Sequence, residues 1–113
     1  MSSVYVLNSL IVPFEGKEAM FYVRRVTADE ARRYIKGRSI ISAIGHKSTA
    51  DALSVILGRK VEVNRIRITF KPGDSAIAFV LKQRLPEGTV IKNVEDLNRI
   101  GYELFIIERF EVI

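Results

Sequence analysis

The chain of 113 residues lacks cysteine and tryptophan and contains a single histidine, His46. The absence of cysteine excludes disulfide bonds, thiolate metal sites and a cysteine nucleophile. One histidine is too few for a zinc cluster, and the acidic residues are scattered rather than grouped as a magnesium site requires. Neither a Walker-type phosphate loop nor a Gly-x-Ser-x-Gly motif is present. We therefore expect no metal and no cofactor, so that any phosphodiester chemistry proceeds without metal.

Long apolar segments are also missing. No run approaches the roughly 18 residues of a membrane span, and the first residues lack the basic start and apolar stretch of a signal peptide. We expect a cytoplasmic protein without membrane contact. A hydrophobic content of 48% is enough to bury a core, and the length fits one domain spanning residues 1–113.

The charge balance is basic, with 18 Lys and Arg residues against 13 Asp and Glu residues and a net charge of +5. Such a surplus favours polyanionic partners such as phosphates, nucleotides or nucleic acid, and it equally fits a basic solvated surface. A small chain without disulfides or metal is only modestly stabilised by its core. An oligomer is therefore a reasonable expectation.

Hydrophobic patterning predicts strands at residues 4–12, 20–26, 64–70, 75–84 and 102–112, with residues 40–45 as a loop or a short strand. Helices are predicted at residues 28–36 after the capping box Thr27-Ala28-Asp29-Glu30, through Leu57 from a cap at Ser48 or Thr49, and at residues 94–100 after Asn93. Gly37, Gly58 and Gly101 suit the left-handed stops of these helices. Because strands and helices do not alternate strictly, we expect an α+β (α/β-like) fold. Its mixed sheet of about five strands would be flanked by helices.

His46 is the first candidate for function. It follows Gly45, which allows a ligand to approach the backbone closely. It also precedes the predicted start of a helix, whose N–H groups and partial positive charge favour a phosphate. A histidine there can donate a proton to a leaving oxygen near neutral pH. The alternative reading is a loop histidine that caps or packs.

Arginines at strand ends are the second group of candidates. Asn64-Arg65 opens a predicted strand, and the run from Gln83 through Arg84 closes another. An arginine can clamp a phosphate with two parallel hydrogen bonds and stabilise developing charge, although most arginines at strand ends are simply solvated. Arg67, two residues further into its strand, is expected to be solvated and replaceable.

Asn8 is the third candidate, because it lies in the middle of an otherwise apolar predicted strand. A buried amide needs hydrogen-bond partners or costs roughly 1–3 kcal/mol. Asn8 therefore either satisfies a neighbouring loop or contacts a ligand.

Four blocks occur in order along the chain: Leu7-Asn8-Ser9, Ser42-Ala43-Ile44-Gly45-His46-Lys47-Ser48-Thr49, Asn64-Arg65 and Gln83-Arg84-Leu85-Pro86-Glu87-Gly88. In order and spacing they resemble the anti-CRISPR ring nucleases, small viral and cellular proteins first known as a conserved crenarchaeal virus domain. The resemblance covers nearly the whole chain. It is greatest to the branch from filamentous archaeal viruses, which shares the stretch Gly101-Tyr102-Glu103-Leu104.

The resemblance implies a homodimer that binds cyclic tetra-adenylate across its interface and cleaves it without a metal or cofactor, switching off type III CRISPR signalling. It implies His46, Arg84 and Glu87 as catalytic residues. As ligand-binding residues it implies Asn8, Ser9, Gly45, Ser48, Arg65 and Gln83. No stable DNA or protein partner is implied. Two positions depart from the family's pattern, since Ile11 stands where many members have a serine and Lys47 where many have an acidic residue.

Two other readings stay open. The positive charge is compatible with a non-enzymatic viral nucleic-acid-binding protein, although the chain has no helix-turn-helix signature, no RNP-like aromatic pair and no long basic stripe. The apolar end at residues 102–113 is compatible with an interaction protein that assembles through an exposed strand edge.

Overall fold

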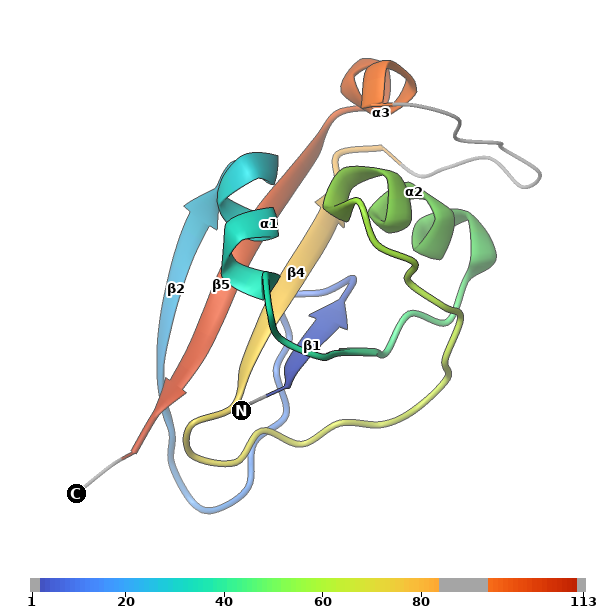
Figure 1. The fold of residues 1–113 in the computed structure, drawn as a ribbon. Helices are drawn as coiled ribbons and strands as arrows, with labels where there is room; N and C mark the ends of the chain where they lie inside the picture. Colours follow the sequence, from blue (N-terminus) through green and yellow to red (C-terminus); the bar gives the residue numbers. More distant parts are fainter. Residues whose placement is uncertain (1–2, 84–93, 112–113) are drawn as a thin grey trace.

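A mixed sheet organises the fold, which a computed structural model describes for residues 3–83 and 94–111. The strands are β1 (Val4–Leu7), β2 (Met20–Val26), β3 (Ile40–Ser42), β4 (Ser75–Leu81) and β5 (Tyr102–Phe110). The helices are α1 (Ala28–Ile35), α2 (Lys47–Leu57) and α3 (Val94–Ile100). Figure 1 shows their arrangement.

The five strands follow the order β2-β5-β4-β1-β3. β1 is parallel to both of its neighbours, β3 and β4, whereas β5 is antiparallel to β4 and to β2. The expected α+β fold with a mixed sheet of about five strands and flanking helices is therefore confirmed.

Local signals place the start of α1 and the glycines that follow the helices where the sequence predicts them. The Glu30 N–H donates to Thr27 Oγ1 (3.2 Å) and the Thr27 N–H donates to Glu30 Oε1 (3.0 Å), which closes the predicted capping box. These bonds, above all the one from the backbone, hold the pKa of Glu30 below its ordinary value. Gly37, Gly58 and Gly101 all have positive φ just after the helices, as expected. Within the described ranges, none of the helices has the length and apolar character of a membrane span.

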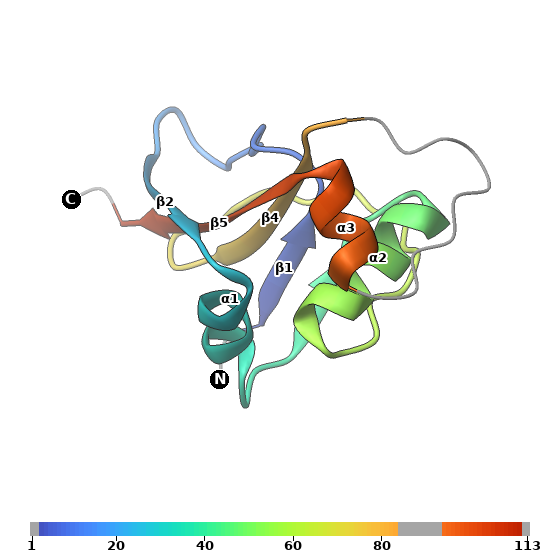
Figure 2. The same ribbon diagram turned by 90° about the horizontal axis from the view of Figure 1, so that it is seen from above.

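Both faces of the sheet are covered, one by helices and the other by chain without regular secondary structure. Helices α1 and α2 lie over one face, while the chain that follows β1 crosses the other (Figure 2). On the helix face the core joins strand and helix side chains, among them Val4, Val6, Ile77, Phe79, Ile106, Ile35, Leu53 and Ile56. On the second face Phe70 is fully buried among Leu7, Ala76, Ala78, Phe105 and Ile107. Because both faces are covered, β4 is apolar from Ala76 to Leu81 and does not alternate.

The first predicted strand is too long, since β1 ends at Leu7 instead of residue 12. The Ile11 N–H donates to Ser9 Oγ (3.0 Å), and this local bond turns the chain away from the sheet. Asn8 is consequently exposed beyond the strand end and is not buried in its middle. The apolar Val12 instead packs against the core of the second face.

The strand predicted at residues 64–70 is wrong. Within this segment only Phe70 forms a β-bridge, an isolated one with Phe14, and the residue just before it, Val63, forms another with Ile44. The edge of the sheet is occupied by β3. The alternation is only partly reflected in burial, because Phe70 is buried whereas Ile66 is 43% exposed. Of residues 40–45, left open as a loop or a short strand, Ile40–Ser42 form the short strand β3 and the rest lie outside it.

Smaller corrections concern element boundaries. Helix α2 begins at Lys47 with His46 as its N-cap, so the predicted cap at Ser48 or Thr49 lies inside the helix. β4 ends at Leu81, before the predicted limit at residue 84. The predicted cap Asn93 lies outside the described residues.

Candidate functional site

The carboxyl ends of parallel strands bring several predicted residues to one end of the sheet. β1 lies between β3 and β4 and runs parallel to both, so the segments that follow all three strands emerge at the same end. Asn8 and Ser9 follow β1, Gly45 and His46 come shortly after β3, and Gln83 comes shortly after β4. In open sheets with parallel strands, ligands bind outside this end.

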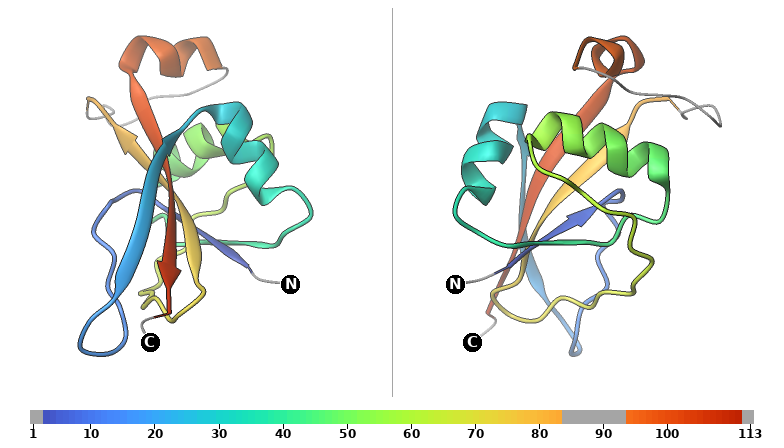
Figure 3. Two further views of the ribbon diagram at one scale, coloured as in Figure 1. Left: turned by 90° about the vertical axis from the view of Figure 1, so that its left-hand side faces the viewer. Right: turned by 45° about the vertical axis from the view of Figure 1, so that its right-hand side comes forward.

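An open hollow of about 320 Å³ lies at this end. Its walls come from the chain after β1, the residue after β3 and the segment after α2, and Figure 3 (right) shows these parts next to one another. The lining residues are Leu7, Asn8, Ser9, Ile11, Pro13, Ala43, Ile66, Arg67 and Ile68. The Ala43 N–H donates to the Val6 carbonyl (3.0 Å), which fixes the first two walls against each other.

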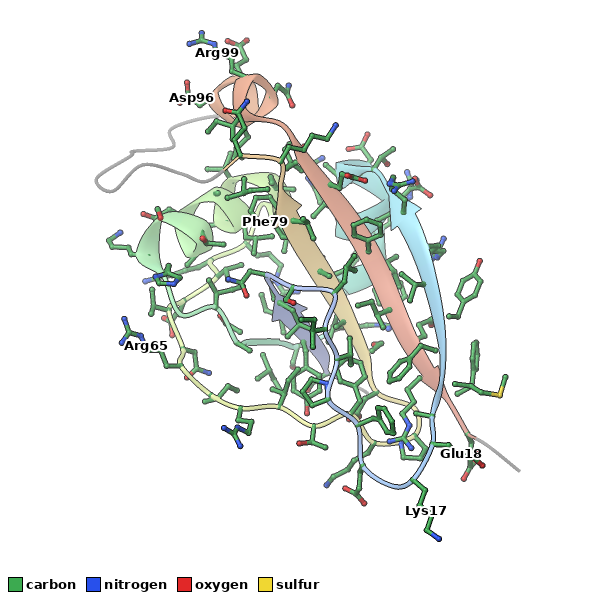
Figure 4. The ribbon with its side chains drawn as sticks, turned by 180° about the vertical axis from the view of Figure 1, so that it is seen from behind. Lys17, Glu18, Arg65, Phe79, Asp96 and Arg99 are labelled. Atoms are coloured by element: carbon green, nitrogen blue, oxygen red, sulfur yellow. The ribbon has the colours of Figure 1, made fainter. Side chains whose placement is uncertain are left out.

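Hydrogen bonds from Asn64 and Arg65 hold the third wall in place. The Asn64 N–H donates to the Ile44 carbonyl (2.8 Å), and its side-chain Nδ2 donates to the Ser42 carbonyl (2.8 Å). Arg65 Nε donates to the Gly45 carbonyl (3.1 Å), so this arginine lies directly beside the residue that precedes His46. In Figure 4, Arg65 projects outward near the start of α2.

His46 occupies the N-cap position of α2 in an extended conformation, with φ −126° and ψ 134°. Its carbonyl accepts from the Ala50 N–H (3.0 Å), while its imidazole makes no capping hydrogen bond and the residue is exposed. The first turn of α2 contains no acidic residue. Its partial positive charge is therefore not offset by a side chain of that turn, which favours an anion there.

The structure brings some predicted residues together and leaves others apart. Asn8 and Ser9 line the hollow, and Arg65 contacts Gly45 next to His46. Ser48 is half-buried in the first turn of α2, and Gln83 is exposed at the same end of the sheet. Arg84 and Glu87 lie outside the described residues.

Arg67 is exposed, as the sequence analysis expected, and it also lines the hollow with Asn8 and Ser9. No signal in the sequence marked this position, because the hollow is lined by the consecutive residues Ile66, Arg67 and Ile68 and not by alternate residues of a strand.

A larger hollow of about 670 Å³ lies elsewhere, between the end of β2, α3 and the start of β5. Of the predicted site residues that the structure describes, none lines it, and its Arg25 is already paired with Glu103 (2.5 Å). Size alone does not identify a site, so the hollow beside Asn8 and Arg65 remains the candidate.

Comparison with known proteins identifies relatives over almost the full length. Residues 4–104 match the STIV B116-like family. The chain is 46% identical over 110 residues to protein ORF117 of Acidianus two-tailed virus. This alignment covers 96% of this chain and 94% of ORF117. It is 40% identical over 106 residues to protein 26 of Sulfolobus islandicus filamentous virus (isolate Iceland/Hveragerdi). This alignment covers 93% of this chain and 90% of protein 26.

Similarity extends to bacteria and to a solved structure. Protein YddF of Bacillus subtilis (strain 168) is 34% identical over 108 residues, with 93% of this chain and 95% of YddF covered. The solved structure of protein B116 of Sulfolobus turreted icosahedral virus has the same fold, with a TM-score of 0.81 at 22% sequence identity. The superposition covers 94% of this chain and 98% of B116. The chain belongs to the STIV B116-like family, whose members include small proteins of crenarchaeal viruses.

Proposed function

We propose that this protein is a metal-independent ring nuclease that binds cyclic tetra-adenylate and cleaves it, thereby switching off type III CRISPR signalling. The observation that carries the proposal is a hollow lined by Asn8, Ser9 and Arg67, together with Arg65 on the adjoining segment, which is bonded to the carbonyl of Gly45 next to His46. This combination offers hydrogen-bond donors, positive charge and a proton donor to a phosphodiester.

The proposed reaction uses the nucleophile that the substrate already contains. The ribose 2′-hydroxyl releases its proton to water and its oxygen attacks the adjacent phosphorus, so that a new 2′-oxygen–phosphorus bond forms and the bond from phosphorus to the 5′-oxygen breaks. His46 donates a proton to the leaving 5′-oxygen, and Arg65 and Arg84 balance the charge on the phosphoryl oxygens. The resemblance to ring nucleases adds Glu87 as an acidic residue needed for activity. The products are linear di-adenylates with a 2′,3′-cyclic phosphate.

The contacts of Ser9 support a role in ligand binding despite the departure at Ile11. Ser9 Oγ accepts a hydrogen bond from the Ile11 N–H (3.0 Å). A hydroxyl that accepts one bond can still donate its proton to an oxygen of the ligand. In our proposal Ser9 takes the role of the serine that many relatives have at the position of Ile11. Ile11 itself is 83% exposed.

The size of the hollow supports a homodimer as the active unit. A volume of about 320 Å³ is near the lower end of the roughly 300–1,000 Å³ of small-molecule pockets, and a ring of four nucleotides needs more surface than it provides. In a symmetric dimer, the second copy would supply an identical hollow to a ligand that has matching symmetry. Ser48, Gln83 and the start of α2 would complete the binding surface.

Incubation of the protein with cyclic tetra-adenylate in EDTA tests the proposal. We expect linear products that carry a 2′,3′-cyclic phosphate, with no change in rate on adding divalent ions. The matched control is His46→Ala in the same buffer, which separates cleavage by this protein from cleavage by a contaminating nuclease. Intact ring after long incubation, or turnover that requires a divalent ion, would refute the proposed chemistry.

A non-enzymatic nucleic-acid-binding function is the second candidate, favoured by the net charge of +5 and by the exposed Arg65 and Arg67. Binding through phosphate contacts would weaken steeply with salt and would not depend on ring closure. Competition between linear and cyclic oligoadenylates for the protein therefore separates the two functions. Equal affinity for both, without cleavage, would favour the binding protein.

A further inference from the structure

Two segments that are separated in the sequence meet beside His46. The first is the connection from β3 to α2, and the second is residues 61–65, which follow α2. Ile44 in the first segment and Val63 in the second form an isolated parallel bridge. A single bridge holds two segments only loosely, so the side chains between them matter for how Arg65 lies relative to His46.

Ser42, the last residue of β3, is a buried polar residue that joins these two segments. Its Oγ donates to the Glu62 carbonyl (2.5 Å) and accepts from the Ile44 N–H (3.2 Å). Burying a hydroxyl is costly unless it is hydrogen-bonded, and here it acts both as a donor and as an acceptor. One side chain therefore ties the connection that leads to His46 to the segment that leads to Arg65.

Asn64 joins the same segments from the other side. Its Nδ2 donates to the Ser42 carbonyl (2.8 Å), and its N–H donates to the Ile44 carbonyl (2.8 Å). Because Asn64 immediately precedes Arg65, these bonds fix the backbone from which the arginine side chain starts. We refer to the four hydrogen bonds of Ser42 Oγ and Asn64 as the polar brace.

The Arg65 side chain lies across the backbone of Gly45. Its Nε donates to the Gly45 carbonyl (3.1 Å), and a Cβ added to Gly45 would lie 3.6 Å from Arg65 Cγ. An exposed arginine ordinarily samples many rotamers, and this contact restricts them. The Nε bond uses one of the five N–H groups of the guanidinium, so the terminal N–H groups can bind a phosphate in a defined direction.

His46 is held independently, by helix α2. Its carbonyl accepts from the Ala50 N–H (3.0 Å), and Ala50 is 1% exposed in the core. Gly45 connects the two groups, because its carbonyl binds Arg65 and the next residue is His46. The position of the guanidinium relative to the imidazole therefore depends on the polar brace at one end and on α2 at the other.

We propose that Ser42 and Asn64 are positioning residues that hold the Arg65 guanidinium beside His46 and thereby align it for ring cleavage. The inference rests on the proposed function, and neither residue touches the substrate in it. Arg65 has to face the phosphoryl oxygens while His46 faces the leaving 5′-oxygen of the same phosphodiester. A displacement of about 1 Å in such an arrangement can lower the rate about a hundredfold. Binding depends less on alignment, because a displaced Arg65 keeps its charge.

Ser42→Ala and Asn64→Ala test the brace, and Ser54→Ala is the matched control. Ser54 Oγ also joins α2 to the segment after it, because it donates to the Ala50 carbonyl (2.8 Å) and accepts from the Val61 N–H (2.8 Å). Its removal costs hydrogen bonds of the same kind, near the opposite end of α2 from His46. Urea unfolding of the three variants measures the loss of stability that they share.

Single-turnover cleavage at saturating cyclic tetra-adenylate gives the functional readout. We expect the rate to fall about ten- to hundredfold in Ser42→Ala and Asn64→Ala and less than about threefold in Ser54→Ala. The affinity for the ring is expected to change less than about threefold in all three variants. Rates in Ser42→Ala and Asn64→Ala that equal the rate in Ser54→Ala would overturn the proposal.

A double-mutant cycle separates positioning of Arg65 from a general loosening of the site. If Ser42 acts through Arg65, then Ser42→Ala in the Arg65→Ala background lowers the remaining rate less than about threefold. The same fall in both backgrounds would show that Ser42 acts elsewhere and would overturn the proposal.

Hydrogen exchange at Arg65 Nε, followed by NMR, gives a readout that does not require ring cleavage. We expect exchange of this N–H with water to be at least about tenfold faster in Ser42→Ala and Asn64→Ala than in wild type, and unchanged in Ser54→Ala. Exchange that is unchanged in the first two variants would refute the brace, whatever the activity. If the exchange follows the expectation while the wild-type protein leaves the ring intact, the proposed function fails and the positioning of Arg65 stands.

Discussion

Arg109 holds together two of the three walls of the candidate site, and its removal is the most informative perturbation of the fold. The residue is on β5 and is 6% exposed. Its NH2 donates to the Glu15 carbonyl (2.8 Å) and its NH1 to the Phe70 carbonyl, at the far ends of the segments that line the hollow. Its guanidinium also lies 5.8 Å from the centre of the Phe14 ring.

The expected magnitude follows from these contacts. Each hydrogen bond from a charged donor contributes about 1.5–3 kcal/mol, so Arg109→Met loses two such contributions. Part of this loss is offset, because burying a charge is costly and Arg109 Nε has no hydrogen-bond partner among the described residues. Methionine also fills much of the space. We expect a net loss of about 2 kcal/mol, and a melting temperature lower by roughly 8 °C at about 4 °C per kcal/mol for a chain of this size.

Urea unfolding of Arg109→Met and of the control Arg99→Met measures this difference. Arg99 is exposed on α3 and projects away from the body of the protein (Figure 4). Amide hydrogen exchange gives a local readout, since the Glu15 N–H donates to the Phe70 carbonyl (3.0 Å) and the Phe70 N–H to the Pro13 carbonyl (2.8 Å). We expect both amides to exchange faster in Arg109→Met. Equal stability of the two variants, with unchanged exchange at these amides, would refute the clamp.

Three further predictions concern the proposed site and helix α1. His46→Ala should lower the rate of ring cleavage by about 10²–10⁴ while leaving binding largely intact, measured by single-turnover kinetics; full activity would remove the assignment of the general acid. Arg65→Ala and Arg67→Ala should each weaken binding of labelled cyclic tetra-adenylate about ten- to hundredfold, and affinities equal to that of Arg99→Ala would mean that the phosphate lies elsewhere. Because the pKa of Glu30 is lowered on folding, the stabilisation from its carboxylate is complete above the pKa of the unfolded chain and is lost as pH falls through the folded value. The difference in urea midpoint between wild type and Glu30→Gln should therefore be largest at neutral pH and vanish in acid, whereas a constant difference would contradict this origin.

The sequence by itself determined the features that depend on local contacts. The capping box at Thr27 and Glu30 needs only residues three apart, and the left-handed glycines Gly37 and Gly58 need only their own backbone freedom. The core face of α2 was also predictable, because Ala52, Leu53, Ile56 and Leu57 recur at helical spacing and all are buried. Charge and motif patterns directed attention to His46, Arg65 and Asn8 before any fold was known.

Only the tertiary structure decided which apolar segments became strands. Residues 64–70 alternate as a strand does, yet the place beside β1 is taken by the short β3. The interaction protein that was considered would have used residues 102–113 as an edge, but β5 lies between β2 and β4, and the open edge belongs to β2. The role of Arg109 was equally hidden, because its hydrogen bonds join β5 to Glu15 and Phe70, which lie far from it in the chain. A strand exists only with its partners, and long-range partners are set by the packing of the whole molecule rather than by local sequence.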